Sequence, residues 1–79
     1  MARKRTNGEL LRERREARGV NQDELAARAG YAHKASISRF ETGARTLNSA
    51  RLFELCSLIE RIADERLGKI DAAEVLAGE

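Results

Sequence analysis

The chain has 79 residues, of which 42% are hydrophobic and 35% charged, with no proline and a single cysteine. This length allows one small domain, and one cysteine excludes an internal disulfide or a cysteine-rich metal cluster. No apolar run approaches the roughly 18 residues of a membrane span, and no signal-peptide core is visible, so we expect a cytoplasmic protein. Alanine, leucine, glutamate and arginine dominate, which predicts an all-α fold.

Positive charge is concentrated in the first two thirds of the chain. Residues 1–51 hold 12 lysines and arginines against 6 acidic residues, whereas residues 52–79 hold 3 against 7. A basic front half joined to an acidic end favours a polyanionic partner that meets one face of the molecule. The alternative is an ordinary solvated surface, because this charged fraction is common in small helical proteins. Only three residues are aromatic, which disfavours a stacking platform for single-stranded nucleic acid.

A basic arm, residues 1–7, precedes the first predicted helix. Its start, MARKR, lacks apolar periodicity, so we expect it to be disordered in isolation. Such an arm could follow a DNA backbone or enter a minor groove, or it could serve only as a solubilising tail. Thr6 and Glu9 have the spacing of a capping box. They predict a helix over Gly8–Arg18 that ends at Gly19.

Two short helices joined by a tight connection are predicted next. The first spans Gln22–Ala29, with Asn21 as its N-cap and Gly30 as its stop. The second spans Lys34–Thr42 and ends at Gly43. This layout suits an element that lies in a groove of DNA.

The second of these helices has distinct inner and outer sides. Helical spacing turns Ile37 and Phe40 toward the core. It places the following residues on the opposite side: Lys34, Ala35, Ser38 and Arg39. Short residues flanked by two long cations favour contact with a ligand, because a helix that faces only solvent more often carries Glu–Lys pairs there.

A longer helix, capped by Asn48 or Ser49, carries a sustained apolar stripe. The stripe is wider than one thin core needs, which indicates a subunit contact. Gly68 is expected to end this helix. Residues 68–79 then hold a last short helix, Ala72–Ala77, as a possible dimer contact.

The stretch from Gly8 to Ile59 resembles the Cro/C1-type helix-turn-helix family, also called the XRE family, of phage repressors and bacterial regulators. The matching strings are GELLRERREARGVNQDELAARAG, then SISRFETG, then ARLFELCSLI. The resemblance implies a five-helix, lambda-repressor-like DNA-binding domain over residues 8–67 that usually acts as a homodimer. One helix would cross the DNA backbone and the next would enter the major groove.

The resemblance also implies roles for individual residues. Gln22 matches a glutamine that contacts a phosphate, and Arg15 and Glu41 match a pair that forms a partly buried salt bridge. The positions that usually meet base edges correspond to the following residues: Lys34, Ala35 and Arg39. These positions are therefore the candidate DNA contacts of highest interest.

Three positions depart from the family pattern. Between Gly30 and Ser38 the chain is one residue longer than the commonest form, which leaves the start of the following helix uncertain by one residue. Arg14 stands where an apolar residue is usual, and Leu47 stands where many members have proline. None of these departures contradicts the fold.

The outer residues each have more than one reading. Arg39 could bind guanine through O6 and N7, or it could contact a phosphate or form a salt bridge. Lys34 could meet a base or a phosphate. Ser36 is expected to touch a phosphate, whereas Ser38 could donate a hydrogen bond or serve as a spacer.

Three further residues are candidates for binding or redox roles. His33 lacks partner ligands for a metal, but it could donate to a phosphate or base, or be only an exposed turn residue. Its protonated form would bind DNA better, which predicts weaker binding as pH rises through the imidazole range. Arg45 could contact the DNA backbone or minor groove, or remain a free surface residue. Cys56 is expected to be a packed core residue rather than a redox sensor.

These patterns predict a sequence-specific regulator of double-stranded DNA, bacterial or phage-encoded and nucleoid-associated. It would be a repressor of Cro-like or restriction–modification controller type, with polymerase contact possible if it activates. The alternatives are an antitoxin that neutralises a partner toxin and autoregulates its operon, with residues 60–79 as the contact surface, and a non-specific architectural binder. The sequence shows no catalytic constellation or glycine-rich phosphate loop, so we expect no enzyme activity, cofactor or metal.

Overall fold

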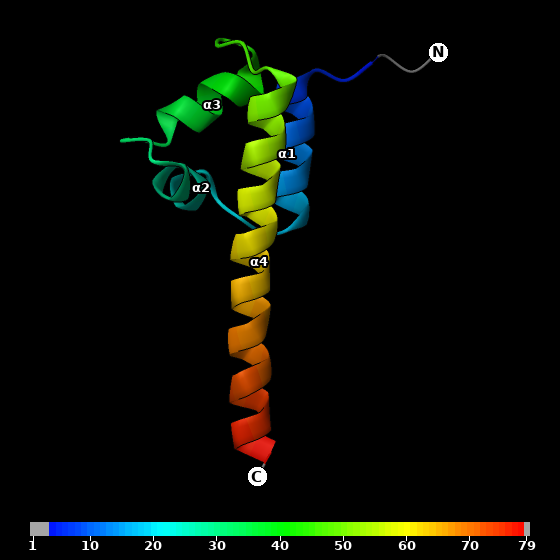
Figure 1. The fold of residues 1–79 in the computed structure, drawn as a ribbon, viewed down its shortest axis with the longest axis vertical. Helices are drawn as coiled ribbons and strands as arrows, with labels where there is room; N and C mark the ends of the chain where they lie inside the picture. The colour runs from blue at the N-terminus through cyan, green and yellow to red at the C-terminus, as the bar shows by residue number, and fades with distance from the viewer. Residues whose placement is uncertain (1–3, 79) are drawn as a thin grey trace.

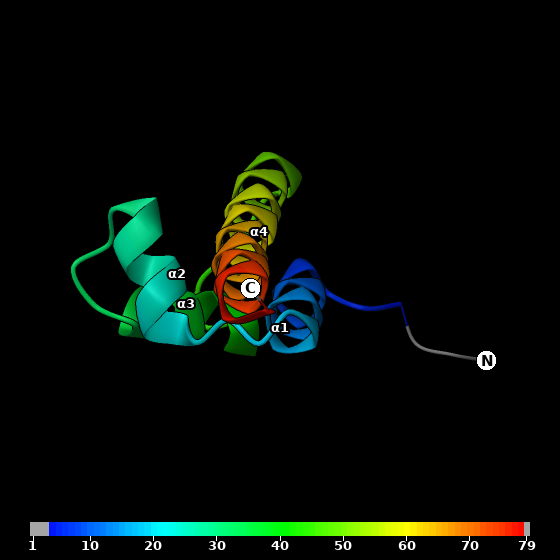
Figure 2. The ribbon, with the colours of Figure 1, turned by 90° about the horizontal axis from the view of Figure 1, so that it is seen from below.

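A computed structural model describes residues 4–78, and the side chains of residues 4–68. It contains four helices, α1 (Asn7–Ala17), α2 (Gln22–Ala29), α3 (Ala35–Thr42) and α4 (Ser49–Gly78), and no strand among these residues. Helices α1 and α2 lie on either side of α4, and each also packs against α3 (Figures 1 and 2). The all-α prediction is confirmed, but the predicted count of five helices is wrong.

Capping boxes are present at two helix starts, including the one predicted at Thr6. The Glu9 amide donates to Thr6 Oγ1 at 3.1 Å, and the Thr6 amide donates to Glu9 Oε1 at 3.1 Å. Asn21 and Glu24 make the same reciprocal pair at the start of α2. Helix α1 begins at Asn7 and ends at Ala17, one residue earlier at each end than predicted. The predicted bounds of α2 are confirmed.

Left-handed glycines follow the first three helices. Gly19, Gly30 and Gly43 all have positive φ, between 66° and 84°, which a residue with a Cβ adopts only with strain. The sequence predicted a helix stop at each of these three glycines. The ends of α1, α2 and α3 are therefore set by the local backbone conformation that these glycines adopt.

One hydrophobic core joins all four helices and two loop residues. Its buried members are Leu11, Val20, Leu25, Ala26, Ile37, Phe40, Leu47, Leu55, Ile59 and Ile62. Leu47, which replaces the proline of many family members, fills this core from the α3–α4 loop. Its burial explains why an apolar side chain serves at that position.

Gly8 allows the closest approach between two helices. A Cβ added there would overlap the carbonyl oxygen of Phe40 and come within 3.1 Å of the carbonyl oxygen of Glu41. The first turn of α1 therefore rests directly on the backbone of α3. This contact fixes where α3 lies relative to the rest of the fold.

Helix α4 is continuous through Gly68, so the predicted stop there and the separate helix Ala72–Ala77 are corrected. Gly68 is not among the described glycines with positive φ, and the space around it is open. A glycine inside a helix costs only about 1 kcal/mol relative to alanine, and the chain has no proline to stop the helix. Figure 1 shows the C-terminal part of α4 running on beyond the other three helices.

None of the described helices combines the length and hydropathy needed to cross a membrane.

Candidate nucleic-acid interface

The turn between α2 and α3 sets the direction of α3. After Gly30, the Tyr31 amide donates to the Ala26 carbonyl at 2.9 Å. The Tyr31 ring packs edge-on against Phe40 of α3, with centroids 6.0 Å apart. Lys34 is the N-cap rather than the first helical residue, so α3 begins one residue later than predicted. The extra residue in this segment is accommodated in the turn.

Arg51, in the first turn of α4, holds this turn in place. Its guanidinium lies 5.0 Å from the centroid of the Tyr31 ring, and its Nε donates to Tyr31 Oη at 2.8 Å, with a second donor on the same oxygen. Its Nη1 also pairs with Glu54 Oε2 at 2.7 Å. The hydrogen bond to Tyr31, followed by that to Glu54, raises the pKa of Arg51. Sequence reasoning missed this clamp, because its two residues are twenty positions apart.

A buried carboxylate joins α1, α2 and α3. Glu41 is only 8% exposed, and it accepts from Arg15 Nε at 2.7 Å and from Arg15 Nη2 at 3.0 Å. It also accepts from Gln22 Nε2 at 3.1 Å. Arg15 further donates to the Val20 carbonyl at 3.0 Å. The hydrogen bond to Glu41 raises the pKa of Arg15, so its guanidinium stays charged.

The residues predicted to meet DNA lie on the start of α2, on α3 and on its two flanks. The exposed ones are His33, Lys34, Ala35, Arg39 and Arg45. Those that are half-buried are Gln22, Ser36 and Ser38. We call these eight positions together the α3 edge. The Arg45 guanidinium lies 5.3 Å from the Phe40 centroid, so an aromatic ring of α3 supports it.

The cations of the α3 edge differ from the other arginines in their partners. Among the described residues, Lys34, Arg39 and Arg45 have no carboxylate within ion-pair distance, a property shared only with Lys4 and Arg61. The arginines that have such a carboxylate are Arg5, Arg12, Arg14, Arg15, Arg18, Arg28, Arg51 and Arg66. Three of the five described cations that have no carboxylate partner therefore belong to α3 and its flanks.

His33 lies at the mouth of α3 beside a surface hollow. With Lys34 and Ala35 it faces the α2 residues Asp23, Ala26 and Ala27 across this hollow. Its backbone carbonyl accepts from the Ser36 amide at 3.2 Å, which makes His33 part of the turn into α3. Its imidazole is exposed, so it is accessible to a ligand that approaches the α3 edge.

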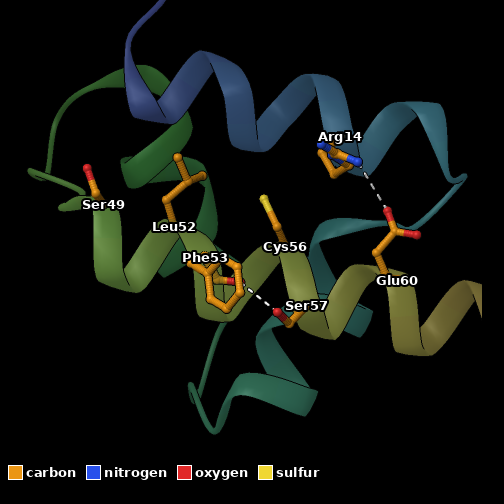
Figure 3. Close-up of a pocket in the computed structure, with 7 residues that line it drawn as sticks. All are labelled: Arg14, Ser49, Leu52, Phe53, Cys56, Ser57 and Glu60. Atoms are coloured by element: carbon orange, nitrogen blue, oxygen red, sulfur yellow. Dashed lines mark hydrogen bonds and ion pairs between the residues drawn. The ribbon is translucent and has the colours of Figure 1, made fainter.

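Cys56 is not in the core, contrary to expectation. It is half-buried and lines a second hollow, between α1 and α4 (Figure 3). Burial raises the pKa of its thiol, so the thiol is protonated at neutral pH. The helical stripe predicted from sequence is correct, but α1 presents Arg14 rather than an apolar residue opposite it. No group of three metal-ligating side chains occurs among the described residues.

The sequence profile of a family described as "Helix-turn-helix domain" matches residues 8–67, which is most of the chain. The chain belongs to this helix-turn-helix family. Searches among curated proteins and among solved structures gave no match. Family membership indicates a DNA-binding regulator, and helices α2 and α3 with their tight connection are the helix-turn-helix unit.

Proposed function

We propose that this helix-turn-helix protein is a sequence-specific transcriptional regulator of the Cro/C1 type that binds a near-palindromic operator as a homodimer. The observation that carries the proposal is the α3 edge, where Lys34, Arg39 and Arg45 have no carboxylate partner among the described residues. DNA phosphates and guanine edges are the partners that such cations bind. The DNA-binding domain covers residues 8–67.

In this proposal α3 enters the major groove with its exposed side toward the bases. Arg39 binds guanine O6 and N7, which would contribute about 1–3 kcal/mol of discrimination against other bases. Lys34 and Ala35 meet neighbouring base edges, and Ala35 is small enough to contact a thymine methyl. Ser38 lies on the same side and allows close approach.

Phosphate contacts flank this base-reading surface. Gln22 is the first residue of α2, where the backbone amides of a helix start favour an anion. One Nε2 hydrogen of Gln22 is directed to Glu41, and the second is available for a phosphate oxygen. Ser36, His33 and Arg45 bind the backbone at either end of α3. These contacts set register and affinity without reading sequence.

Two copies would place their α3 helices in successive major grooves, about 34 Å apart. Such a dimer would repress a promoter by occupying it, in the manner of a Cro-like protein or a restriction–modification controller. The antitoxin alternative would place a toxin against residues 60–79, where two α4 carboxylates also pair within the chain. Glu60 pairs with Arg14 and Arg18, and Glu65 pairs with Arg28.

The test is a selection of bound sequences from random duplex DNA at one fixed salt concentration, since the phosphate contribution depends on salt. A regulator of this kind enriches a two-fold symmetric motif with half-sites about one helical turn apart. The matched comparison is the Arg39→Ala variant, which should lose preference at one position of each half-site. Equal affinity for all sequences would contradict the proposal and favour an architectural binder.

A further inference from the structure

The hollow between α1 and α4 has an apolar floor and an exposed aromatic neighbour. Its lining residues are Arg14, Ser49, Leu52, Phe53, Cys56, Ser57 and Glu60. Figure 3 shows the Phe53 ring projecting from α4, and that ring is 75% exposed. A protruding ring beside an apolar hollow leaves both surfaces in water.

The charges of this hollow balance each other. Arg14 of α1 and Glu60 of α4 face each other across it, with Nη1 and Oε1 3.4 Å apart, and both remain in contact with solvent. The other lining residues are neutral. A polyanion such as DNA would gain little here, and a strongly charged protein of either sign would meet one like charge. A surface with one charge of each sign is instead complementary to its own copy.

We propose that this hollow is the surface through which two copies of the chain form the homodimer. The inference rests on the proposed function, which requires a homodimer but does not say where the copies meet. About a two-fold axis, Phe53 of each copy enters the hollow of the other and covers Leu52 and Cys56. If Arg14 of one copy approaches Glu60 of the other, the two-fold axis repeats that contact on the opposite side, as in any isologous interface.

The position of the hollow is compatible with DNA binding. No residue of α2 or α3 lines it, so a dimer formed here leaves both α3 edges open. A standard protein interface buries roughly 800 Å² per partner, a modest part of the 5770 Å² surface of this chain. A second copy would also extend the thin core that a chain of this length can build.

Cys56 provides a probe of this contact, because it is the one cysteine of the chain and lines the hollow. The experiment measures the molar mass of the protein by sedimentation over a range of concentrations, together with the rate at which a thiol reagent labels Cys56. It compares the wild type with Phe53→Glu. Leu67→Glu is the matched control, because Leu67 is 59% exposed on the same helix but outside the hollow.

We expect the wild type to dimerise and its Cys56 labelling to slow by at least about tenfold as the dimer forms, because only the monomer exposes the thiol. Phe53→Glu should remain monomeric, with a labelling rate independent of concentration, and Leu67→Glu should behave as the wild type. Circular dichroism establishes that each variant is folded. Phe53→Glu should still bind a single half-site while losing affinity for the full palindrome.

Other outcomes overturn the inference in distinguishable ways. If Phe53→Glu still dimerises, or if Cys56 of the wild-type dimer is labelled as fast as that of the monomer, the copies meet elsewhere and the regulator proposal stands. If the wild type is monomeric both free and on its selected DNA, the homodimer itself is wrong. The hollow would then have a different occupant.

Discussion

The arginines of the helical body and the cations of the α3 edge differ in what neutralises them. In the body, arginines of α1, α2 and α4 reach carboxylates of other turns or other helices, as Arg28 does with Glu65 and Arg18 with Glu60. At the α3 edge, Lys34, Arg39 and Arg45 have no such partner among the described residues. Net charge alone hides this difference, because the chain carries only +2. The distribution of partners, rather than the number of cations, identifies the candidate interface.

The ion pairs of the helical body also differ from one another in how deeply they are buried. Arg15 and Glu41 are nearly inaccessible to solvent, whereas both members of the Arg12–Glu16 pair are more than half exposed. An exposed pair contributes between zero and about 1 kcal/mol, but removing one partner of a buried pair leaves an uncompensated charge. The comparison therefore predicts three classes of cation. Those in buried ion pairs stabilise the fold, those in exposed ion pairs contribute little to stability, and those without an ion pair on the α3 edge bind DNA.

The largest expected effect is the loss of stability that follows substitution of Glu41. Glu41→Gln leaves the Arg15 guanidinium buried without its counter-charge and should lower the free energy of unfolding by about 3 kcal/mol. The same change at an exposed pair, Glu16→Gln, should lower it by less than about 0.5 kcal/mol. Urea denaturation at pH 7, followed by circular dichroism, measures both. Equal effects would mean that the buried pair does not join α1 to α3 as described.

Gly8 tests whether the α3 edge depends on close helix packing. Gly8→Ala pushes a methyl group into the Phe40 carbonyl and should destabilise the protein by about 1–3 kcal/mol. Gly68→Ala is the matched control, because that helical glycine has open space around it. It should stabilise the protein by about 0.5–1 kcal/mol. Thermal unfolding gives both values, and a neutral Gly8→Ala would show that α1 does not rest on α3.

Arg39 tests the distinction between unpaired and paired cations directly. Arg39→Ala should weaken binding to the selected operator by about 1–3 kcal/mol, or roughly 5- to 150-fold, and relax one base preference. Arg12→Ala removes the same charge from a paired position and should change affinity by less than about twofold, because it leaves α3 untouched. Fluorescence anisotropy at fixed salt measures both. Comparable losses would mean that only total charge matters.

Substitution of Gln22 distinguishes a neutral phosphate contact from a charged one by the salt dependence of DNA binding. Gln22→Ala should weaken binding to specific and random DNA alike, by about 1 kcal/mol, with no change in the salt dependence. Arg45→Ala, by contrast, should reduce the slope of log affinity against log salt by about 0.9, because Arg45 contacts the DNA backbone in the proposed complex. Affinities at several salt concentrations distinguish the two. A changed slope in Gln22→Ala would show that its loss disturbs neighbouring cations.

Local signals in the sequence predicted much of the fold. The capping box at Thr6, the N-cap at Asn21 and the glycine stops after three helices are decided by a few adjacent residues, and they are present as predicted. Gly68 was misread, because the same residue type ends a helix only where the backbone adopts positive φ. Whether it does so depends on the rest of the helix, which the local sequence does not contain.

Long-range contacts explain what the sequence left open at the candidate site. The residues of the α3 edge follow from helical spacing and the family resemblance. Their lack of internal partners does not, because it depends on which carboxylates the fold brings near. The position of Cys56 at a surface hollow likewise depends on Arg14, which lies 42 positions earlier in the chain.

The last expected effect concerns the clamp between α4 and the turn before α3. Tyr31→Phe keeps the ring against Phe40 but removes the oxygen to which Arg51 donates. It should lower the free energy of unfolding by about 0.5–1.5 kcal/mol. Because Arg51 keeps its pair with Glu54, the α4 start should remain intact while the turn loosens, which would weaken specific DNA binding more than non-specific binding. Denaturation and anisotropy measure the two effects, and an unchanged ratio of specific to random affinity would show that α3 is oriented without the clamp.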